Sequence, residues 1–456
     1  MDLDLQNATL DTINSMDALE AANFENTCFL QARREKRGIL KNKLTTKAEY
    51  EASLAAWKAL PAEQKEKTQP PMPNYIQSAA VVMDNATGAL LAVVGGRDAE
   101  ESKLNRAIQS RRQTGSLFKP FIYATFFQQG NSADTRISDD RIAYEEIRGA
   151  ANWSPRNSDG TYRGEAGLLR SHPFRNTMSV RIGNRAGLSN VIQSAQLAGF
   201  HGNISRTPAL YLGTWEASPL DIASAYSVFA NGGVRPTPYI IDHITDSQGQ
   251  PRFAITKSKR TVYSQRAANI TSSILQQVCK PGGTAGKITA LGFKSPCGGK
   301  TGTTNNYTNA WFAGYTSNLT CSVWVGFDSS TKILEKGYGG TLALPVWVDI
   351  MLAAQKEGYP ANAIRTRPGS EGQAVLVCRE SNQLAHSGCQ YAKTAYFETS
   401  AGYQAPANMC EQHIPMAEPD SEESIPYAEP LDSSDDNIPL AEPVEETDGI
   451  PYATPI

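Results

Sequence analysis

The sequence predicts an α+β fold in which one antiparallel sheet is assembled from distant segments of the chain and helices pack on its faces. Two hairpin patterns lie far apart, at 78–96 and at 310–328, and the second has Ser317 and Asn318 at its turn. Helical patterns fill most of the stretch from about 116 to 275. Strands at both ends of a domain with helices between them favour a single sheet.

Four segments can be distinguished along the chain. Residues 1–75 are polar with helical patterns and end in a proline-rich breaker. Residues 76–368 contain both hairpins and the helices between them, and a short cysteine-containing module spans 372–413. Residues 414–456 repeat the unit IP-x-AEP between acidic spacers, which predicts a disordered or polyproline-like tail.

Individual elements can be located within the second segment. The clearest helix starts at Ser218 and Pro219 and ends at Gly232. In the second hairpin, apolar residues alternate from Cys321 to Phe327, which places them on one face of a strand. Cys321 is therefore predicted to be a core residue and not a reactive thiol.

The composition is that of a soluble globular protein and excludes fibrous and wholly disordered classes. The formal net charge of -3 conceals an asymmetry, because residues 414–456 carry twelve acidic side chains and no lysine or arginine. The rest of the chain has 43 basic and 34 acidic side chains, a balance of about +9. Such a balance suits an anionic envelope or an acidic substrate, although evenly spread, solvated lysines are the simpler explanation. The tail is either a solvating segment or a docking ligand for a protein partner.

The stretch TGSLFKPFIYATFF, residues 114–127, places Lys119 three residues after Ser116 among apolar and aromatic neighbours. On a helix, positions i and i+3 share a face, so the two side chains are expected to point the same way. Apolar surroundings lower the pKa of a lysine, and a serine beside such a base is an activated nucleophile. The alternative is an amphipathic core helix whose Lys119 reaches outward to solvent.

A second pattern, CGGKTGTTNN at 297–306, precedes the first strand of the second hairpin. Its glycines let another chain approach a strand edge closely, while Lys300, Thr301 and Thr303 supply a cation and hydroxyl groups. Such an edge suits an extended peptide with a terminal carboxylate, although alone the pattern is equally typical of a glycine-rich turn. Ser-x-x-Lys early and Lys-Thr-Gly late, on a strand of the same sheet, form a far more specific pair.

With these motifs the chain resembles the transpeptidase domain of class A penicillin-binding proteins, the bifunctional enzymes of peptidoglycan synthesis. The likeness covers residues 78–350 in the family's order and rests on LNRAIQSRRQTGSLFKPFIYA, NWSPRNSDGTYRG, SPLDIASAYSVFANGG, GGTAG, GGKTGTTNNYTNAWFAGYT, VWVGFD and GGTLALPVW. The resemblance implies a serine β-lactamase/transpeptidase-like fold for 76–368, with a five-stranded antiparallel sheet flanked by helices. The module at 372–413 resembles the tail module of some members.

The resemblance also implies roles for individual residues. Ser116 matches the acyl-accepting nucleophile, Lys119 its general base and Asn176 the asparagine of the family's Ser-x-Asn motif. The backbone N–H groups of Ser116 and Thr303 are expected to form the oxyanion hole. The implied catalytic set is Ser116, Lys119, Asn176 and Lys300, and the implied substrate-binding set is Thr301, Gly302 and Thr303.

The Ser-x-Asn motif departs from the family pattern. In RSHPFRNTM the serine position, two residues before Asn176, holds Phe174. Ser171 can replace that serine only if the intervening residues bulge out, which Pro173 favours because it pushes His172 away from helical geometry. His172 is either a substitute proton relay or a structural histidine. Because the serine relays protons in the family, the departure should affect turnover more than acylation.

The implied function is a penicillin-binding D,D-transpeptidase that cross-links peptidoglycan stem peptides through an acyl-serine and is acylated by β-lactams. One alternative is a D,D-carboxypeptidase or β-lactamase, in which water accepts the acyl group. Another is a catalytically impaired homologue that binds peptidoglycan or a protein partner through its tail. The family acts at the periplasmic face of the cell envelope. The membrane anchor and glycosyltransferase domain of the family are not found in this sequence, and neither is a signal peptide. No cofactor or nucleic acid is expected.

Seven cysteines are too few for a disulfide scaffold, and no Cys-x-x-Cys pair indicates a metal or redox site. In a periplasmic protein, Cys279 and Cys297 could nevertheless form a disulfide around the loop between them. One pair among the cysteines of the C-terminal module could form another, and the alternative there is a zinc site that includes His413. The cysteines of that module are Cys378, Cys389 and Cys410.

Overall fold

The computed structural model of the chain describes residues 1–14, 46–71, 74–133, 135–168, 174–202, 204–364, 372–378, 383–389, 392–398 and 408–413. The chain divides into two units, Met1–Pro415 and Met416–Ile456, and all described residues belong to the first. The predicted repeat tail therefore lies outside the described residues. Within the described ranges, no helix combines the length and the apolarity needed to cross a membrane.

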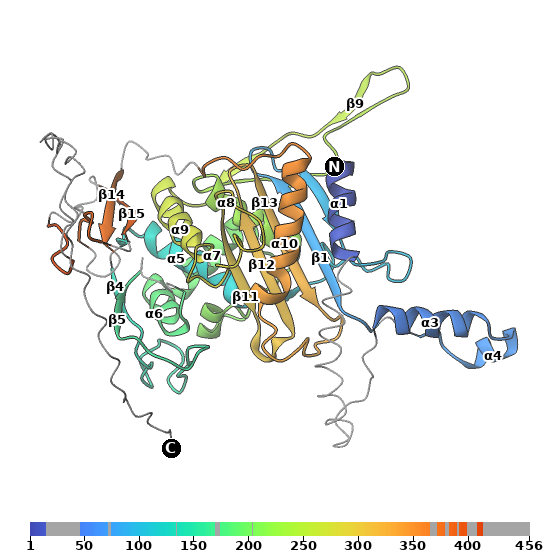
Figure 1. Cartoon of the computed structure of the whole chain (residues 1–456), viewed down its shortest axis with the longest axis horizontal. Coiled ribbons are helices and arrows are strands. Elements are labelled where there is room, and N and C mark those ends of the chain that lie inside the picture. The colour runs from blue at the N-terminus through green and yellow to red at the C-terminus, as the bar shows by residue number, and fades with distance from the viewer. Residues whose placement is uncertain are drawn as a thin grey trace, which may run out of the picture. The chain divides into compact units, whose positions relative to one another are not determined.

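A five-stranded antiparallel sheet forms the centre of the fold, which confirms the predicted class (Figure 1). β1 pairs with β13, so that Val81 lies opposite Ser322 and the two distant hairpin patterns are joined in one sheet. In spatial order the strands are β11 (Gly298–Thr303), β12 (Asn309–Tyr315), β13 (Leu319–Gly326), β1 (Gln77–Asp84) and β2 (Leu90–Val94).

Helices cover both faces of this sheet. On one face, Trp347 of α10 (Gly339–Lys356) packs edge-on against Phe312 of β12, with 5.1 Å between the ring centroids. On the other face, the Ser322 hydroxyl donates a hydrogen bond of 2.6 Å to the first carbonyl of α8 (Pro219–Ala230). Ser322 lies opposite Ala313, and successive strand side chains alternate between faces, so the two helices lie on opposite sides.

Coverage on both faces explains the burial of β13. Cys321 is fully buried, which confirms its prediction as a core residue. Thr320 and Ser322 are fully buried as well, whereas the alternating pattern indicated only one buried face. These polar residues are accommodated because each makes a hydrogen bond, with the Thr320 hydroxyl donating to the Asn85 side-chain oxygen at 2.5 Å.

The predicted start and end of α8 are confirmed. The Ser218 hydroxyl accepts a hydrogen bond from the N–H of Asp221, whose carboxylate accepts one from the N–H of Ser218, and this capping box fixes the first turn. The helix ends at Ala230, shortly before Gly232 with φ 61°. Other described helices are α1 (Leu3–Asn14), α3 (Lys47–Lys58), α4 (Ala62–Lys67), α5 (Lys119–Gln128), α6 (Asn176–Ala186), α7 (Leu188–Ala198) and α9 (Gln265–Val278), with 3-10 turns η1 (Gly115–Phe118), η2 (Pro208–Leu212) and η3 (Asn305–Tyr307).

Short paired strands interrupt the stretch that was predicted to be helical. Between α8 and α9, Pro236 and Pro251 lie within strands, because proline has no N–H to donate inside a helix. Within that stretch, the pairs are β4 (Arg136–Ser138) with β5 (Glu165–Gly167), β7 (Val234–Pro236) with β10 (Lys259–Thr261) and β8 (His243–Thr245) with β9 (Pro251–Ala254). Two further pairs reach outside it: β3 (Arg112–Gln113) with β6 (Glu216–Ala217), and β14 (Gly372–Cys378) with β15 (Ala392–Glu398).

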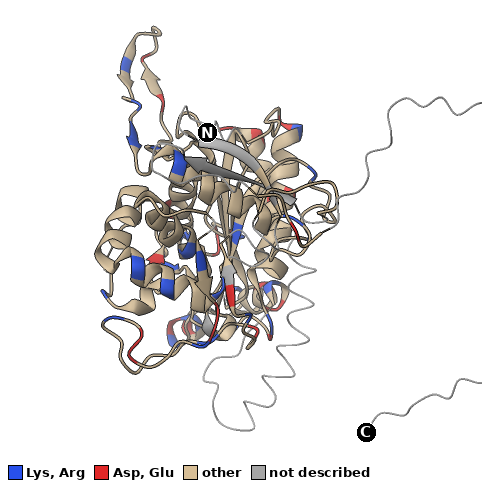
Figure 2. Ribbon diagram, turned by 90° about the vertical axis from the view of Figure 1, so that its left-hand side faces the viewer, with Lys and Arg blue, Asp and Glu red and all other residues tan. Residues whose placement is uncertain are grey.

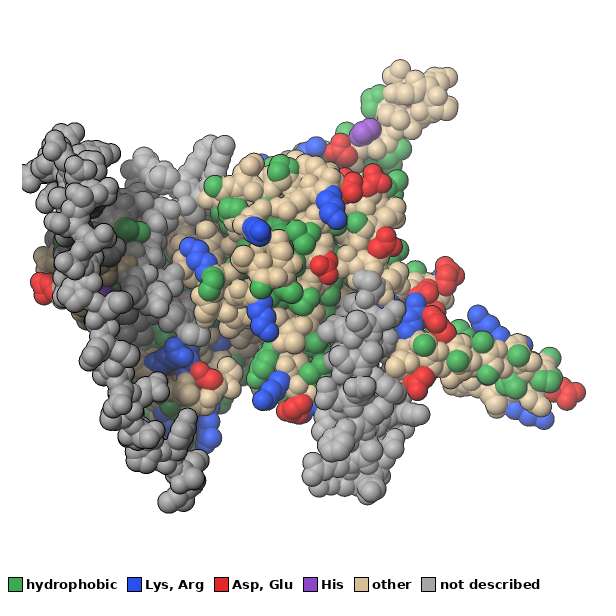
Figure 3. Space-filling model, in the orientation of Figure 1, with side chains coloured by type: hydrophobic (Ala, Val, Ile, Leu, Met, Phe, Trp, Pro, Cys, Tyr) green, Lys and Arg blue, Asp and Glu red, His purple; other side chains and the backbone are tan. Residues whose placement is uncertain are grey.

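Charged side chains are spread over several elements of the described part. Figure 2 shows Lys and Arg positions on helices, hairpins and loops, with Asp and Glu between them. On the face seen in Figure 3, basic side chains lie singly among polar and apolar ones. This distribution fits evenly spread, solvated charges.

Candidate active site

Ser116 lies in a turn that packs directly against β11. The turn is η1, and the Lys-Thr-Gly motif at 300–302 lies within β11. Gly115 has φ +52°, and a Cβ there would lie 2.6 Å from the carbonyl oxygen of Thr303. A side chain at Gly302 would similarly meet the Thr114 carbonyl at 2.8 Å. The glycines in both motifs therefore allow the two backbones to touch, which brings the two predicted motifs together.

Ser116 lies in a 3-10 turn and not in the α-helix that the sequence predicted. The residue is half-buried in the 3-10 turn, and Lys119 is the first residue of the α-helix that follows. Residues i and i+3 of a 3-10 helix are eclipsed, so Ser116 and Lys119 still lie on the same side of the chain.

Lys119 is enclosed by protein, with 1% of its surface exposed. Its Nζ donates hydrogen bonds to the carbonyl oxygen of Phe174 at 2.8 Å and to Oδ1 of Asn176 at 2.6 Å. Burial, followed by the nearby charges of Lys300 and Arg175, lowers the pKa of Lys119 well below its ordinary value. Burial therefore favours the neutral form of the amine, and the side chain does not reach outward to solvent.

Asn176 and Phe174 come from the start of α6 and the residues before it. The Asn176 side chain also donates to the carbonyl of Arg156 at 2.8 Å, which fixes its oxygen towards Lys119. The Phe174 ring lies 4.7 Å from the ring of Tyr123, and Nζ of Lys300 lies 5.7 Å from its centroid. Phe174 thus contacts one lysine through its carbonyl and the other through its ring.

Ser171, His172 and Pro173 lie outside the described residues. The bulge that would bring Ser171 to the motif position therefore stays a prediction, as does the relay role of His172.

Lys300 lies on the face of β11 that contacts the Ser116 turn, because Gly302, two residues further on, contacts that turn. Its Nζ donates to the Thr301 carbonyl at 2.9 Å, and burial lowers the pKa of Lys300 to about 8. The Thr303 hydroxyl accepts a hydrogen bond of 3.0 Å from the N–H of Gly339. This strand presents a buried cation beside a serine and a desolvated lysine, which suits an anionic, extended ligand.

Sequence reasoning assigned no role to two neighbours of the site. Thr284, within GGTAG, accepts a hydrogen bond of 2.9 Å from the Thr301 hydroxyl. Arg175 forms ion pairs with the buried Asp139 and with Asp159, and it contributes to the lowered pKa of Lys119. The Arg175 pair also holds the pKa of Asp159 well below its usual range. Two features of the sequence could have indicated these neighbours: Thr284 lies within the GGTAG motif, and Arg175 directly precedes Asn176.

Cys279 and Cys297 are both buried, and both thiols are free, so the disulfide considered from the sequence is not formed. The sulfur of Cys297 and burial raise the pKa of Cys279 well above its ordinary value.

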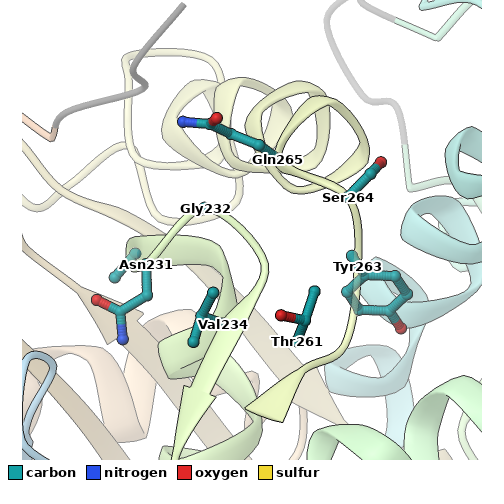
Figure 4. A pocket seen from close by; sticks show the side chains of 8 residues that line it. Asn231, Gly232, Val234, Thr261, Tyr263, Ser264 and Gln265 are labelled. Carbon is teal, nitrogen blue, oxygen red and sulfur yellow. The ribbon is translucent and has the colours of Figure 1, made fainter. Parts of the chain in front are cut away.

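A separate pocket lies at the end of α8 and the start of α9 (Figure 4). Its lining includes Asn231, Thr261, Tyr263 and Gln265, and it contains none of the motif residues. The candidate active site is the group of motif residues on β11, η1, α5 and α6, and it is distinct from this pocket.

The chain was compared with known families and proteins. A family model described as the penicillin binding protein transpeptidase domain matches residues 78–352. The chain is 40% identical over 303 residues to penicillin-binding protein 1A of Neisseria lactamica, an alignment that covers 64% of this chain and 38% of the relative. It is 32% identical over 387 residues to penicillin-binding protein 1A of Pseudomonas aeruginosa, covering 74% and 46% of the two chains. The chain thus spans less than half the length of these curated relatives.

Solved structures give the same picture of the fold. Penicillin-binding protein 1A from Haemophilus influenzae matches with a TM-score of 0.64 at 28% identity, covering 75% of this chain and 55% of that one. The PonA1 protein of Mycobacterium tuberculosis in complex with penicillin V matches with a TM-score of 0.55 at 22% identity, covering 79% and 95%. At 22% identity, the likeness to PonA1 concerns the fold alone.

Proposed function

The chain belongs to the penicillin-binding protein transpeptidase family, and we propose that it is a serine D,D-transpeptidase that cross-links peptidoglycan stem peptides at the periplasmic face of the envelope. The observation that carries the proposal is the buried Lys119, hydrogen-bonded to Asn176 next to the turn that bears Ser116. A desolvated lysine beside a serine provides a base and a nucleophile without a cofactor.

The proposed reaction proceeds through two acyl transfers. Neutral Lys119 accepts the Ser116 proton while Oγ attacks the carbonyl carbon between the two D-alanines. The N–H groups of Ser116 and Thr303 stabilise the oxyanion, and Lys300 with the threonines of β11 holds the terminal carboxylate. D-Alanine leaves with the proton that Lys119 accepted. An amine of a second stem peptide then attacks the ester carbon, the bond to Ser116 Oγ breaks, and a proton from the amine returns to Oγ through Lys119. A β-lactam would acylate the same oxygen.

The proposal is tested by labelling the purified chain with a fluorescent penicillin and following release of the label. Rapid labelling with slow release is expected for a transpeptidase. Rapid release would instead identify a β-lactamase, and the absence of any label would leave only a binding protein. The products formed from synthetic stem peptides separate transpeptidase from carboxypeptidase, because an amine acceptor gives a cross-linked peptide whereas water gives a hydrolysed one.

A second candidate function is a catalytically impaired homologue, and Phe174 is the observation that favours it. Phe174 holds the sequence position of the motif serine, and its ring lies against Lys300. Strained β-lactams need less proton-transfer assistance than peptides, so this protein would form a penicilloyl adduct but cross-link peptides slowly. Its repeat tail would then serve to bind a protein partner.

Changing Phe174 to serine should raise peptide turnover by about tenfold or more, and should raise β-lactam acylation less, because positioned proton transfer contributes about 10² to 10⁴ in rate. Phe174→Ala is the matched control, since it removes the same ring contact with Tyr123 without supplying a hydroxyl. Both rates are measured on the same preparations. If the wild-type chain cross-links at the rate of ordinary family members and Phe174→Ser changes nothing, Ser171 or another group fills the role.

Acylation by a chromogenic cephalosporin should depend on pH in a bell shape. Falling pH protonates Lys119 and removes the base, and the lowered pKa keeps this acid limb far below the range of an ordinary lysine. Rising pH removes the charge of Lys300, whose pKa is about 8, and weakens carboxylate binding. Lys300→Arg keeps its charge, so the alkaline limb should move upward. An unchanged alkaline limb in that variant would assign it to another group.

A further inference from the structure

The C-terminal module brings three cysteines and one histidine to a single point. Their potential ligand atoms, the sulfurs of Cys378, Cys389 and Cys410 and a ring nitrogen of His413, all lie within 4.8 Å of one another. Nδ1 of His413 lies 3.1 Å from Sγ of Cys410 and 3.5 Å from Sγ of Cys378. None of these residues belongs to the candidate active site.

Backbone hydrogen bonds hold the segments that carry these ligands. Cys378 ends β14, and its N–H donates to the Gln383 carbonyl at 2.8 Å. Leu384, which follows Gln383, pairs with the segment that carries Cys410. Its N–H donates to the Asn408 carbonyl at 3.0 Å, and its carbonyl accepts from the N–H of Cys410 at 2.8 Å. The segment at 383–385 therefore ties two cysteine-bearing segments together, and the cluster does not depend on side chains alone.

The distances suit tetrahedral zinc. Zinc–sulfur bonds of about 2.3 Å and zinc–nitrogen bonds of about 2.0–2.1 Å place neighbouring ligand atoms roughly 3.5–3.8 Å apart. The observed separations, from 3.1 Å to the 4.8 Å limit, bracket that range and need only small side-chain adjustments. Three thiolates and an imidazole form a soft, closed ligand set that selects zinc and leaves no open position for catalysis.

The packing of the module gives an independent reason for a metal. Among its described residues, the buried cluster consists of the three cysteines, with Ala385 packed against it. Segments of about 40 residues are commonly stabilised by disulfides or by a metal ion. One disulfide among these three cysteines would leave a thiol and His413 unused, whereas one metal ion uses all four ligand atoms.

His386 lies in the same module but is differently engaged. Its Nδ1 accepts a hydrogen bond of 3.1 Å from the N–H of Gly388, so its Nε2 carries the proton and donates to the Cys410 carbonyl at 2.9 Å. Both ring nitrogens are therefore used, and the ring braces the backbone of a cluster cysteine. We propose that Cys378, Cys389, Cys410 and His413 bind one structural zinc ion, with His386 outside the ligand set.

The test uses the full chain, purified under reducing conditions without chelator. Elemental analysis should find about one zinc per chain. Replacement of zinc by cobalt(II) should produce cobalt–thiolate charge-transfer bands and the visible bands of a tetrahedral site. Cys378→Ser and His413→Ala should reduce bound zinc to near the background, whereas the matched controls Cys297→Ser and His386→Gln should retain it.

One further variant separates ligation from misfolding. His413→Cys should keep the zinc and alter the cobalt spectrum, because four thiolates also form a closed zinc site. Background zinc in the wild-type chain together with three cysteines that react with an alkylating agent would overturn the proposal. A disulfide between two of these cysteines in protein kept from oxidants, detected by mass spectrometry, would overturn it as well.

Discussion

Replacing Ser116 with alanine is expected to abolish the penicilloyl adduct completely. The reason is chemical, because Ser116 is the one residue of η1 with a hydroxyl group and η1 lies between Thr303 and the buried Lys119. Alanine has no side-chain atom that can form an ester. The expected mass increase after incubation with benzylpenicillin should be present in the wild-type chain and absent from the variant by intact-protein mass spectrometry.

The control for this substitution is Ser330→Ala, at an exposed serine outside the site, which should be acylated like the wild-type chain. Since Ser116 is only half-buried, Ser116→Ala should keep its fold, and circular dichroism checks this. A penicilloyl adduct on the folded variant would mean that another residue is the nucleophile, and peptide mapping would identify it.

The sheet could be predicted because its signals are local. Each hairpin pattern carries its own alternation and turn, and only the pairing of β1 with β13 depends on the whole chain. The closeness of Ser116 to the Lys-Thr-Gly strand could be expected once both motifs were found, although the glycine contacts that produce it, such as Gly115 against Thr303, depend on tertiary structure.

The surroundings of Phe174 could not be predicted in the same way. The sequence indicates that an aromatic residue replaces a serine, but the direction of its ring and carbonyl depends on the backbone before α6. The ion pairs of Arg175 with Asp139 and Asp159 join residues that are not neighbours in the sequence. No local sequence pattern predicts such pairs. The spacing of Cys378, Cys389, Cys410 and His413 is likewise not a compact motif, so only their convergence in the structure favours zinc over a disulfide.

Replacing Lys119 with arginine is expected to lower the acylation rate by about 10² to 10⁴. Arginine can donate hydrogen bonds to the Phe174 carbonyl and to Asn176, but its pKa above about 12 prevents it from becoming the neutral base that Ser116 requires. The substitution therefore separates the two roles of the lysine, hydrogen-bond donor and proton acceptor. The measurement is the second-order rate constant for acylation at pH 7.

Lys300→Arg is the matched comparison, because Lys300 is proposed to act through its positive charge, which arginine retains. Its acylation rate should therefore fall much less than that of Lys119→Arg, even though both lysines are buried to a similar degree. A buried arginine is larger than a lysine, so thermal unfolding is compared for the two variants to exclude a difference in stability. If Lys119→Arg is acylated as fast as the wild-type chain while folded, Lys119 serves only as a hydrogen-bond donor, and the proton of Ser116 must leave by another route.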